Sequence, residues 1–96
     1  MGMSLEESLR LTVAALMQAT GDSQRGIAEA LGLTQTQVSR RQSGTASWQL
    51  DDVDALAGHY GVHPLELLDG PTRACDALPE ARLRTAREKE KRGAVR

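Results

Sequence analysis

The sequence predicts an all-α fold, a compact bundle of five short helices, from three observations. Aliphatic residues recur at helical spacing in successive stretches of the chain. Residues that favour helix N-caps precede these stretches, and glycines follow several of them. The 96 residues fit one small domain, and its core is expected to be aliphatic because Phe is absent and Trp48 and Tyr60 are the only aromatic residues.

The first helix is expected between Ser4 and Gly21. Ser4 can cap its N-terminus, and Glu7 completes a capping box three residues later. The residues at helical spacing that predict one buried face are Leu5, Leu9, Thr12, Val13, Leu16 and Met17.

The second helix is expected from Ser23, its N-cap, to Gly32. Its narrow apolar stripe consists of Ile27, Ala28 and Leu31. Gly26 inside this helix costs about 1 kcal/mol relative to Ala. It is either a tolerated weakness or a place where the backbone approaches a phosphate group closely. Gly32 stands where the chain must reverse into a third helix.

Three signals mark the start of the third helix. Thr34 is a favourable N-cap, Gln37 completes a capping box, and Leu33 with Val38 has the spacing of a hydrophobic staple. At about 100° per residue, Val38 faces inward together with Arg41 and Gln42.

The outer face of the third helix is polar and holds no acid. Thr36, Arg40 and Ser43 point away from Val38. An ordinary solvated face is one interpretation, but such faces typically carry Glu and Lys. Arg, Gln, Ser and Thr are instead the side chains that pair with base edges, so this face is interpreted as a nucleic-acid reader.

Two further helices follow the loop of residues 43–47. Leu50, Val53, Leu56, Ala57 and Tyr60 predict the fourth helix, which Gly61 ends. His63 or a neighbour caps a brief fifth helix with Pro64 at its first position. Leu65, Leu67 and Leu68 supply more apolar surface than so short a helix needs, so this surface either closes the core or forms a dimer interface.

Residues 1–70 are expected to form the DNA-binding domain, and residues 71–96 a linker and a charged tail. Residues 1–78 hold five arginines and ten acids, whereas residues 79–96 hold seven basic residues and three acids. Residues 79–92 favour helix by propensity but have Leu83 as almost their only apolar anchor. The tail either solubilises the chain or approaches DNA phosphates.

One set of residues carries a resemblance to a known family. They are Gln24, Ile27, Ala28, Leu31, Gly32, Thr34, Val38, Ser39, Arg40 and Gly44, followed by Leu56, Ala57, Gly61, Val62, Leu67 and Leu68. In their order and spacing, residues 5–69 resemble the lambda-repressor and Cro-like (XRE-type) helix-turn-helix family of transcription regulators. The resemblance implies a five-helix bundle whose third helix lies in the major groove of DNA.

The resemblance, together with the polar composition, implies roles for individual residues. The expected base-reading residues are Gln35, Thr36, Ser39 and Arg40. The expected phosphate-binding residues are Gln24, Arg25, Gln37, Arg41, Ser43 and Thr45. Arg41 departs from the family's pattern, which often has an apolar residue there, so it either covers the edge of the core or reaches a phosphate.

The expected function is sequence-specific binding of double-stranded DNA by a transcriptional regulator, either a repressor that occludes promoter DNA, which is the favoured role, or an activator, depending on where its site lies. A homodimer through Leu65 and Leu68 is expected, because a single copy offers few positive charges. Two alternatives stay open: an antitoxin-type regulator whose C-terminal tail binds a protein partner, and a protein-interaction module that has lost DNA reading.

Enzymatic activity, cofactors and metal ions are not expected. His59 and His63 are separated by the helix-ending Gly61, and Cys75 is the only thiol, so the histidines are interpreted as surface or structural residues. The apolar stretch 11–19 is interrupted by Thr12 and Gln18, which predicts a helix face rather than a signal peptide or a membrane span. The single cysteine, Cys75, excludes an intramolecular disulfide and fits a reducing cytoplasm, so a cytoplasmic location is expected.

Overall fold

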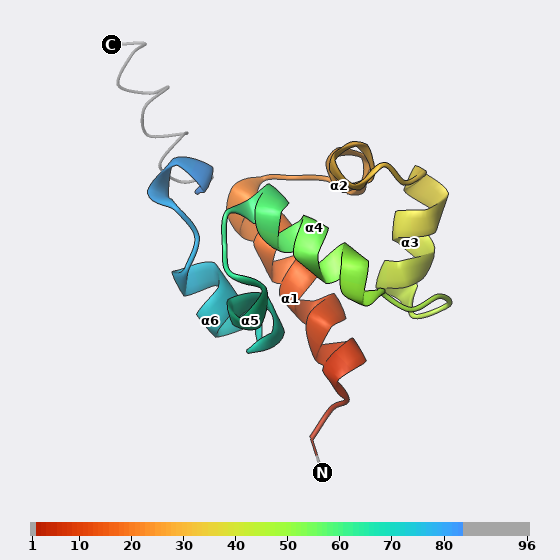
Figure 1. The fold of residues 1–96 in the computed structure, drawn as a ribbon, viewed down its shortest axis with the longest axis horizontal. Helices are drawn as coiled ribbons and strands as arrows, with labels where there is room; N and C mark the ends of the chain where they lie inside the picture. Colours follow the sequence, from red (N-terminus) through yellow and green to blue (C-terminus); the bar gives the residue numbers. More distant parts are fainter. Residues whose placement is uncertain (1, 84–96) are drawn as a thin grey trace.

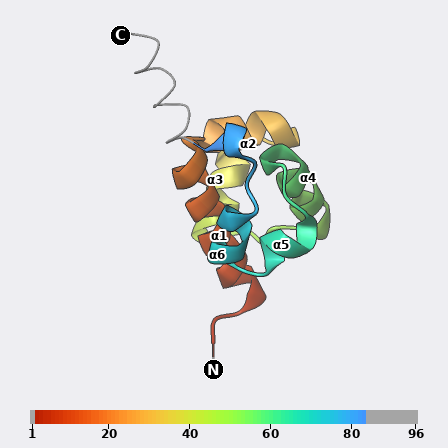
Figure 2. The same cartoon turned by 90° about the vertical axis from the view of Figure 1, so that its left-hand side faces the viewer.

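Regular structure in residues 2–83, the part that the computed structural model describes, is entirely helical (Figure 1). The elements are α1 (Leu5–Thr20), α2 (Gln24–Leu31), α3 (Gln35–Ser43), α4 (Leu50–Tyr60), α5 (Pro64–Leu68), α6 (Pro71–Asp76) and the 3-10 helix η1 (Glu80–Arg82). The all-α prediction is confirmed. Helix α1 packs against α3, α5 and α6, and α4 packs against α2 and α5. Helices α5 and α6 lie together on the side of the bundle away from α3 (Figure 1, Figure 2).

Helices α1, α2, α3 and α5 begin at the N-cap residues that the sequence predicts. In the capping box of α1, Ser4 N donates to Glu7 Oε1 at 3.0 Å, and Glu7 N donates to Ser4 Oγ at 3.1 Å. Ser23 Oγ accepts from Gly26 N at 3.1 Å at the start of α2. His63 Nδ1 accepts from Leu65 N at 3.1 Å, so His63 caps α5 as predicted. Each cap satisfies a backbone N–H that would otherwise lack a partner at the helix end.

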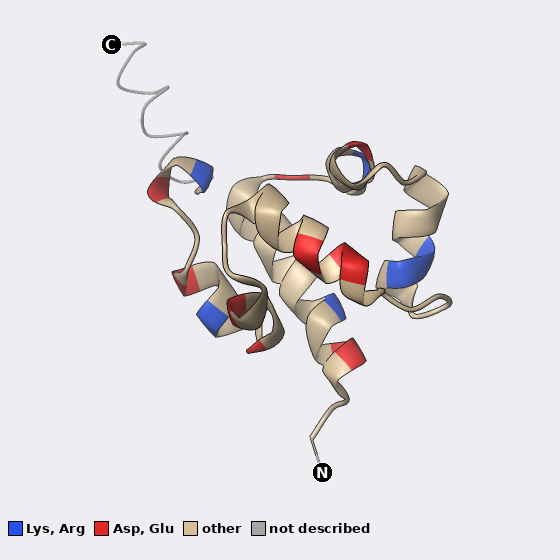
Figure 3. Cartoon of the chain, viewed as in Figure 1, with Lys and Arg blue, Asp and Glu red and all other residues tan. Residues whose placement is uncertain are grey.

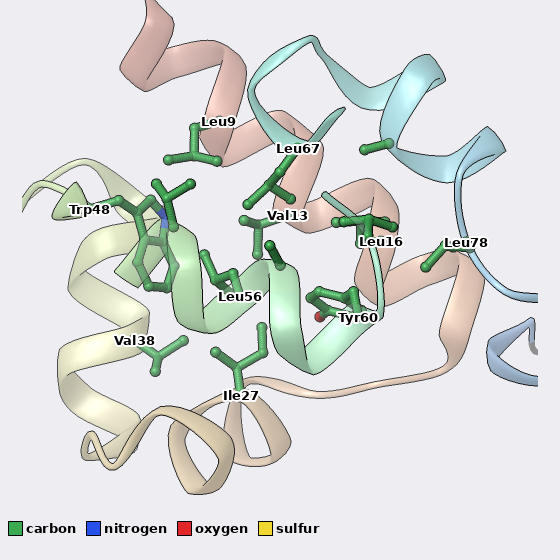
Figure 4. Close-up of a cluster of buried hydrophobic side chains, with 14 of the residues drawn as sticks. Leu9, Val13, Leu16, Ile27, Val38, Trp48, Leu56, Tyr60, Leu67 and Leu78 are labelled. Carbon is green, nitrogen blue, oxygen red and sulfur yellow. The ribbon is translucent and has the colours of Figure 1, made fainter. Parts of the chain in front are cut away.

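The core is built from side chains of α1 to α6 and of the segments between and after them, and aromatic residues contribute more than predicted (Figure 4). Leu16, Ile27, Val38, Leu56 and Leu67 are completely buried. Tyr60 is also completely buried and Trp48 is 8% exposed, so the expectation of a purely aliphatic core is wrong. Trp48 Nε1 and Tyr60 OH both have hydrogen-bond partners, so burial of these two side chains leaves no polar atom unsatisfied.

The expected linker at residues 71–78 is instead part of the packed body. Pro71 is the first residue of α6, Ala74 in its middle is completely buried, and Leu78 after it is 7% exposed. Proline ends one helix but also suits the first position of another, which is the role it has here. The chain stays packed beyond residue 70, whereas the expectations for residues 84–96 lie outside the described residues.

None of the helices in residues 2–83 is both long enough and apolar enough to cross a membrane.

Candidate nucleic-acid interface

Helices α2 and α3 form a helix-turn-helix at one side of the bundle (Figure 1). Gly32 follows α2 with a φ of +70°, a left-handed conformation that glycine adopts without a steric penalty. Leu33 N donates to Ala28 O at 2.9 Å. The capping box of α3 follows, with Thr34 N donating to Gln37 Oε1 at 2.8 Å and Gln37 N donating to Thr34 Oγ1 at 3.1 Å. The predicted reversal and the predicted start of α3 are both confirmed.

Val38 holds the inner side of α3 in the core. Its side chain is completely buried, and it is the one buried residue of α3. Ala28 of α2 is 5% exposed, and its small side chain lets α2 pack closely against its neighbours. Because Val38 points inward, Thr36, Arg40 and Ser43 are left exposed, as the helical periodicity predicts.

The outer side of α3 presents the four predicted base-reading residues, Gln35, Thr36, Ser39 and Arg40, all of which are exposed. Within residues 2–83, their side chains make no hydrogen bond or ion pair to the rest of the chain. Their donors and acceptors are therefore available to another molecule. The structure brings these four side chains together on one helix face.

The predicted phosphate-binding residues flank this face and differ in their exposure and in their hydrogen bonds. Gln24 is the first residue of α2 and is partly exposed, and Arg25 is exposed. Gln37 is exposed, but its Oε1 is used by the capping box, which leaves its Nε2 free to donate. Ser43 is the last residue of α3, and its Oγ donates to Arg40 O at 3.1 Å and lies 3.0 Å from Thr45 Oγ1 in the loop that follows. The two hydroxyls thus shape the loop.

Arg41 is held inside the protein. Its Nε donates to Asp52 Oδ2 at 3.0 Å, and its guanidinium carbon lies 5.9 Å from the centre of the Trp48 ring. The side chains of Arg41 and Asp52 are only 15% and 13% exposed. Of the two interpretations of Arg41, this geometry is that of a residue that covers the edge of the core. Its partner, Asp52, lies on α4, and the sequence alone does not pair these two residues.

Gln42, the next residue of α3, connects that helix to α1. Its Oε1 accepts from Trp48 Nε1 at 2.9 Å, and its Nε2 donates to the backbone oxygen of Arg10 at 3.1 Å. The sequence places Gln42 on the inward face beside Val38, where it is partly buried, and an amide withdrawn from water needs hydrogen-bond partners within the protein. That pattern is the signal from which this network could have been anticipated.

Asp22, in the turn before α2, joins that turn to α4. Its Oδ2 lies 2.7 Å from His59 Nε2 and accepts from Tyr60 OH at 3.2 Å, while Oδ1 accepts from Ser23 N at 2.8 Å. Burial alone would raise the pKa of Asp22, but the hydrogen bonds, that of His59 foremost, hold this pKa below its ordinary value of 3.8. Burial and the nearby carboxylate raise the pKa of Tyr60. His59 is thus a structural residue.

Charge is unevenly distributed over the described helices (Figure 3). Residues 24–44, which span the helix-turn-helix, hold three arginines and Glu29 as their one acid. Helix α4 begins with Asp51 and Asp52 and continues with Asp54. The helix-turn-helix is therefore a locally basic part of a body that is acidic overall, although Arg41 is paired with Asp52 of α4.

Comparison with known proteins agrees with this arrangement. The BetR domain family matches residues 6–93, which is nearly the whole chain and covers α1 to α6 except Leu5, the first residue of α1. No match was found among curated proteins or among solved structures. The chain belongs to the BetR domain family, a family of helix-turn-helix-like DNA-binding domains.

Proposed function

We propose that this protein is a transcriptional regulator that binds double-stranded DNA sequence-specifically through the outer face of α3. Gln35, Thr36, Ser39 and Arg40 would read base edges in the major groove. The observation that carries the proposal is the state of these four side chains, which are exposed and free of partners within residues 2–83. Because Val38 lies in the core behind them, these four side chains face outward from α3.

Contacts to the DNA backbone would set the register of α3 in the groove. Gln24 and Arg25 at the start of α2, Gln37 Nε2, and the hydroxyls of Ser43 and Thr45 surround the reading face. The donors of Gln24, Arg25 and Gln37 suit phosphate oxygens, which position a protein on the duplex without carrying sequence information. Ser43 Oγ donates to Arg40 O and lies 3.0 Å from Thr45 Oγ1, so a phosphate would replace these bonds within the chain. Arg41 stays with Asp52 in this scheme, so it is the one predicted phosphate ligand that the proposal leaves out.

A homodimer would supply the affinity that a single copy lacks. Few positive charges face the DNA, and two copies on half-sites about one helical turn apart double the contacts. Leu65 is 69% exposed, and Leu68 is partly exposed beside it on α5. These two leucines are our proposed dimer surface. Occupation of promoter DNA by the dimer would then repress transcription.

Selection of the full chain against random duplex DNA at physiological salt tests this function. We expect a recurrent motif with two related halves, because binding, base reading and dimer symmetry all contribute to enrichment. Failure to enrich any motif, with no salt-dependent affinity for duplex DNA, would favour a protein-interaction module. Co-purification of a small protein with the full chain, but not with a chain that ends at Leu83, would favour a tail that binds a partner.

A further inference from the structure

We propose that Asp52, acting through Arg41, is a positioning residue for DNA reading, and that Arg41 itself does not contact phosphate. The inference rests on the proposed function of α3 and adds to it the side chains that hold the end of the reading helix. Neither Asp52 nor Trp48, whose ring packs against the Arg41 guanidinium, belongs to the reading face, so both would act on DNA only through α3.

One carboxylate oxygen ties the end of α3 to the beginning of α4. Asp52 Oδ2 accepts from Gln49 N at 2.8 Å, which caps α4, and from Arg41 Nε at 3.0 Å, in the last turn of α3. A shift of α3 relative to α4 would lengthen the bond to Arg41. The carboxylate that caps α4 thereby also holds the end of α3 in place.

Trp48 lies between the two inward polar residues of α3. Its ring lies under the Arg41 guanidinium, and its Nε1 donates to Gln42, which in turn donates to Arg10 O of α1. Trp48 is itself 8% exposed and part of the core (Figure 4). Arg41 and Gln42 thus hold the end of α3 against α4 and α1, respectively.

Helix α3 needs this second attachment because Val38 is its one buried residue. A single apolar side chain serves as a pivot about which a helix of nine residues can still turn. Base recognition tolerates misplacements of only about 0.5 Å and 10–20°. The polar contacts at residues 41 and 42 remove the remaining rotation, which is why we assign them to positioning.

Release of Arg41 toward a phosphate would be unfavourable. It would leave the Asp52 carboxylate, which is 13% exposed, without its cation, and breaking such a pair from one side is costly. The neighbouring Arg40 is exposed and has no such partner within residues 2–83, so it can meet DNA freely. Adjacent arginines thus have different tasks.

The test compares the affinities of full-chain variants for the selected duplex and for a random duplex over a range of salt concentrations. Asp52→Asn keeps the shape but removes the charge that holds Arg41. We expect it to weaken binding of the selected duplex roughly tenfold, while random-duplex binding does not weaken. Asp51→Asn, which removes the same charge from an exposed neighbour, is the control and should weaken neither.

Arg41→Lys and Arg41→Ala separate positioning from phosphate binding. If Arg41 positions α3, the salt dependence of binding is unchanged in Arg41→Ala, and Lys does not restore full affinity because it lacks the planar fork. If Arg41 binds phosphate, Arg41→Ala lowers the slope of log K against log salt by about one, and Lys nearly restores binding. The second result overturns the inference.

Stability and function are controlled separately. Thermal unfolding of each variant, followed by circular dichroism, sets a temperature at which all are folded, and affinities are compared there. A purely structural pair would change the melting temperature and leave the affinity of the folded protein unchanged, which would also overturn the inference. If the wild-type chain itself shows no salt-dependent duplex binding, it is the proposed function that fails.

Discussion

A single close contact explains why residue 26 is a glycine. A Cβ at this position would overlap Oδ1 of Asp22, whose carboxylate is held by His59 and Tyr60. Neither interpretation from the sequence, a tolerated weakness or a close approach to phosphate, anticipated this. The helix accepts a poor helix former because the side chain of Asp22 needs the space.

The exchange Gly26→Ala should therefore destabilise the protein although alanine favours helix. Displacing Asp22 from its hydrogen bonds outweighs the gain of about 1 kcal/mol in helix propensity, for a net loss of about 1 kcal/mol. Urea denaturation measures this loss. In an Asp22→Ala background the same exchange should stabilise the protein. Stabilisation of equal size in both backgrounds would contradict the contact.

Stability should fall in acid through Asp22. Its pKa is lowered in the folded protein, so its contribution is present above the unfolded value and is lost as pH falls through the folded value, below 3.8. Denaturation followed from pH 6 downward should show a shallower loss in Asp22→Asn than in the wild type. If the free energy of unfolding falls equally with pH in the two proteins, Asp22 does not contribute to the loss of stability in acid.

At the scale of helices, the N-cap residues make the helix boundaries predictable from the sequence. The polar contacts between different helices are not predictable in this way. Ser4, Ser23 and Thr34 act within three residues of themselves, so their roles can be inferred from local sequence. Asp52 is eleven residues from Arg41 and meets it only because α3 and α4 pack together. The outward direction of the reading face was predictable because Val38 sets it by helical periodicity.

Helix α6 was missed because it offers so little apolar surface. Ala74 and Leu78 are the buried residues of this segment, and Pro71 was interpreted as a break although it begins the helix. No helical stripe is visible in a segment with a single buried alanine on its helix. The packing against α1 decides the structure here, not the local pattern.

The exchange Ala74→Asp tests whether α6 belongs to the folded body. A buried carboxylate without a partner should lower the free energy of unfolding by about 3 kcal/mol or more. Thr72→Asp, at an exposed position of the same helix, should change it by less than about 0.5 kcal/mol. Both values come from urea denaturation. Equal, small effects would mean that residues 71–78 are a linker after all.

At the scale of the whole molecule, an acidic body carries one locally basic face, which is the face proposed to read DNA. Residues 1–78 have twice as many acids as arginines, yet α3 has no acid and two arginines. If α3 reads DNA as proposed, the acidic body disfavours non-specific attraction of DNA, and association depends on contacts at the helix-turn-helix. The sequence shows this division directly, because it depends on composition along the chain and not on tertiary partners.

The central claim is that the outer face of α3 reads bases, and the base preference of Arg40→Ala tests it most directly. Affinities are measured for the selected duplex and for all single base-pair replacements in it, with Gln24→Ala as the control. We predict that Arg40→Ala relaxes the preference at one base pair and costs about 1 to 3 kcal/mol there, whereas Gln24→Ala weakens all duplexes about equally. An unchanged preference profile in Arg40→Ala would contradict the assignment of this face.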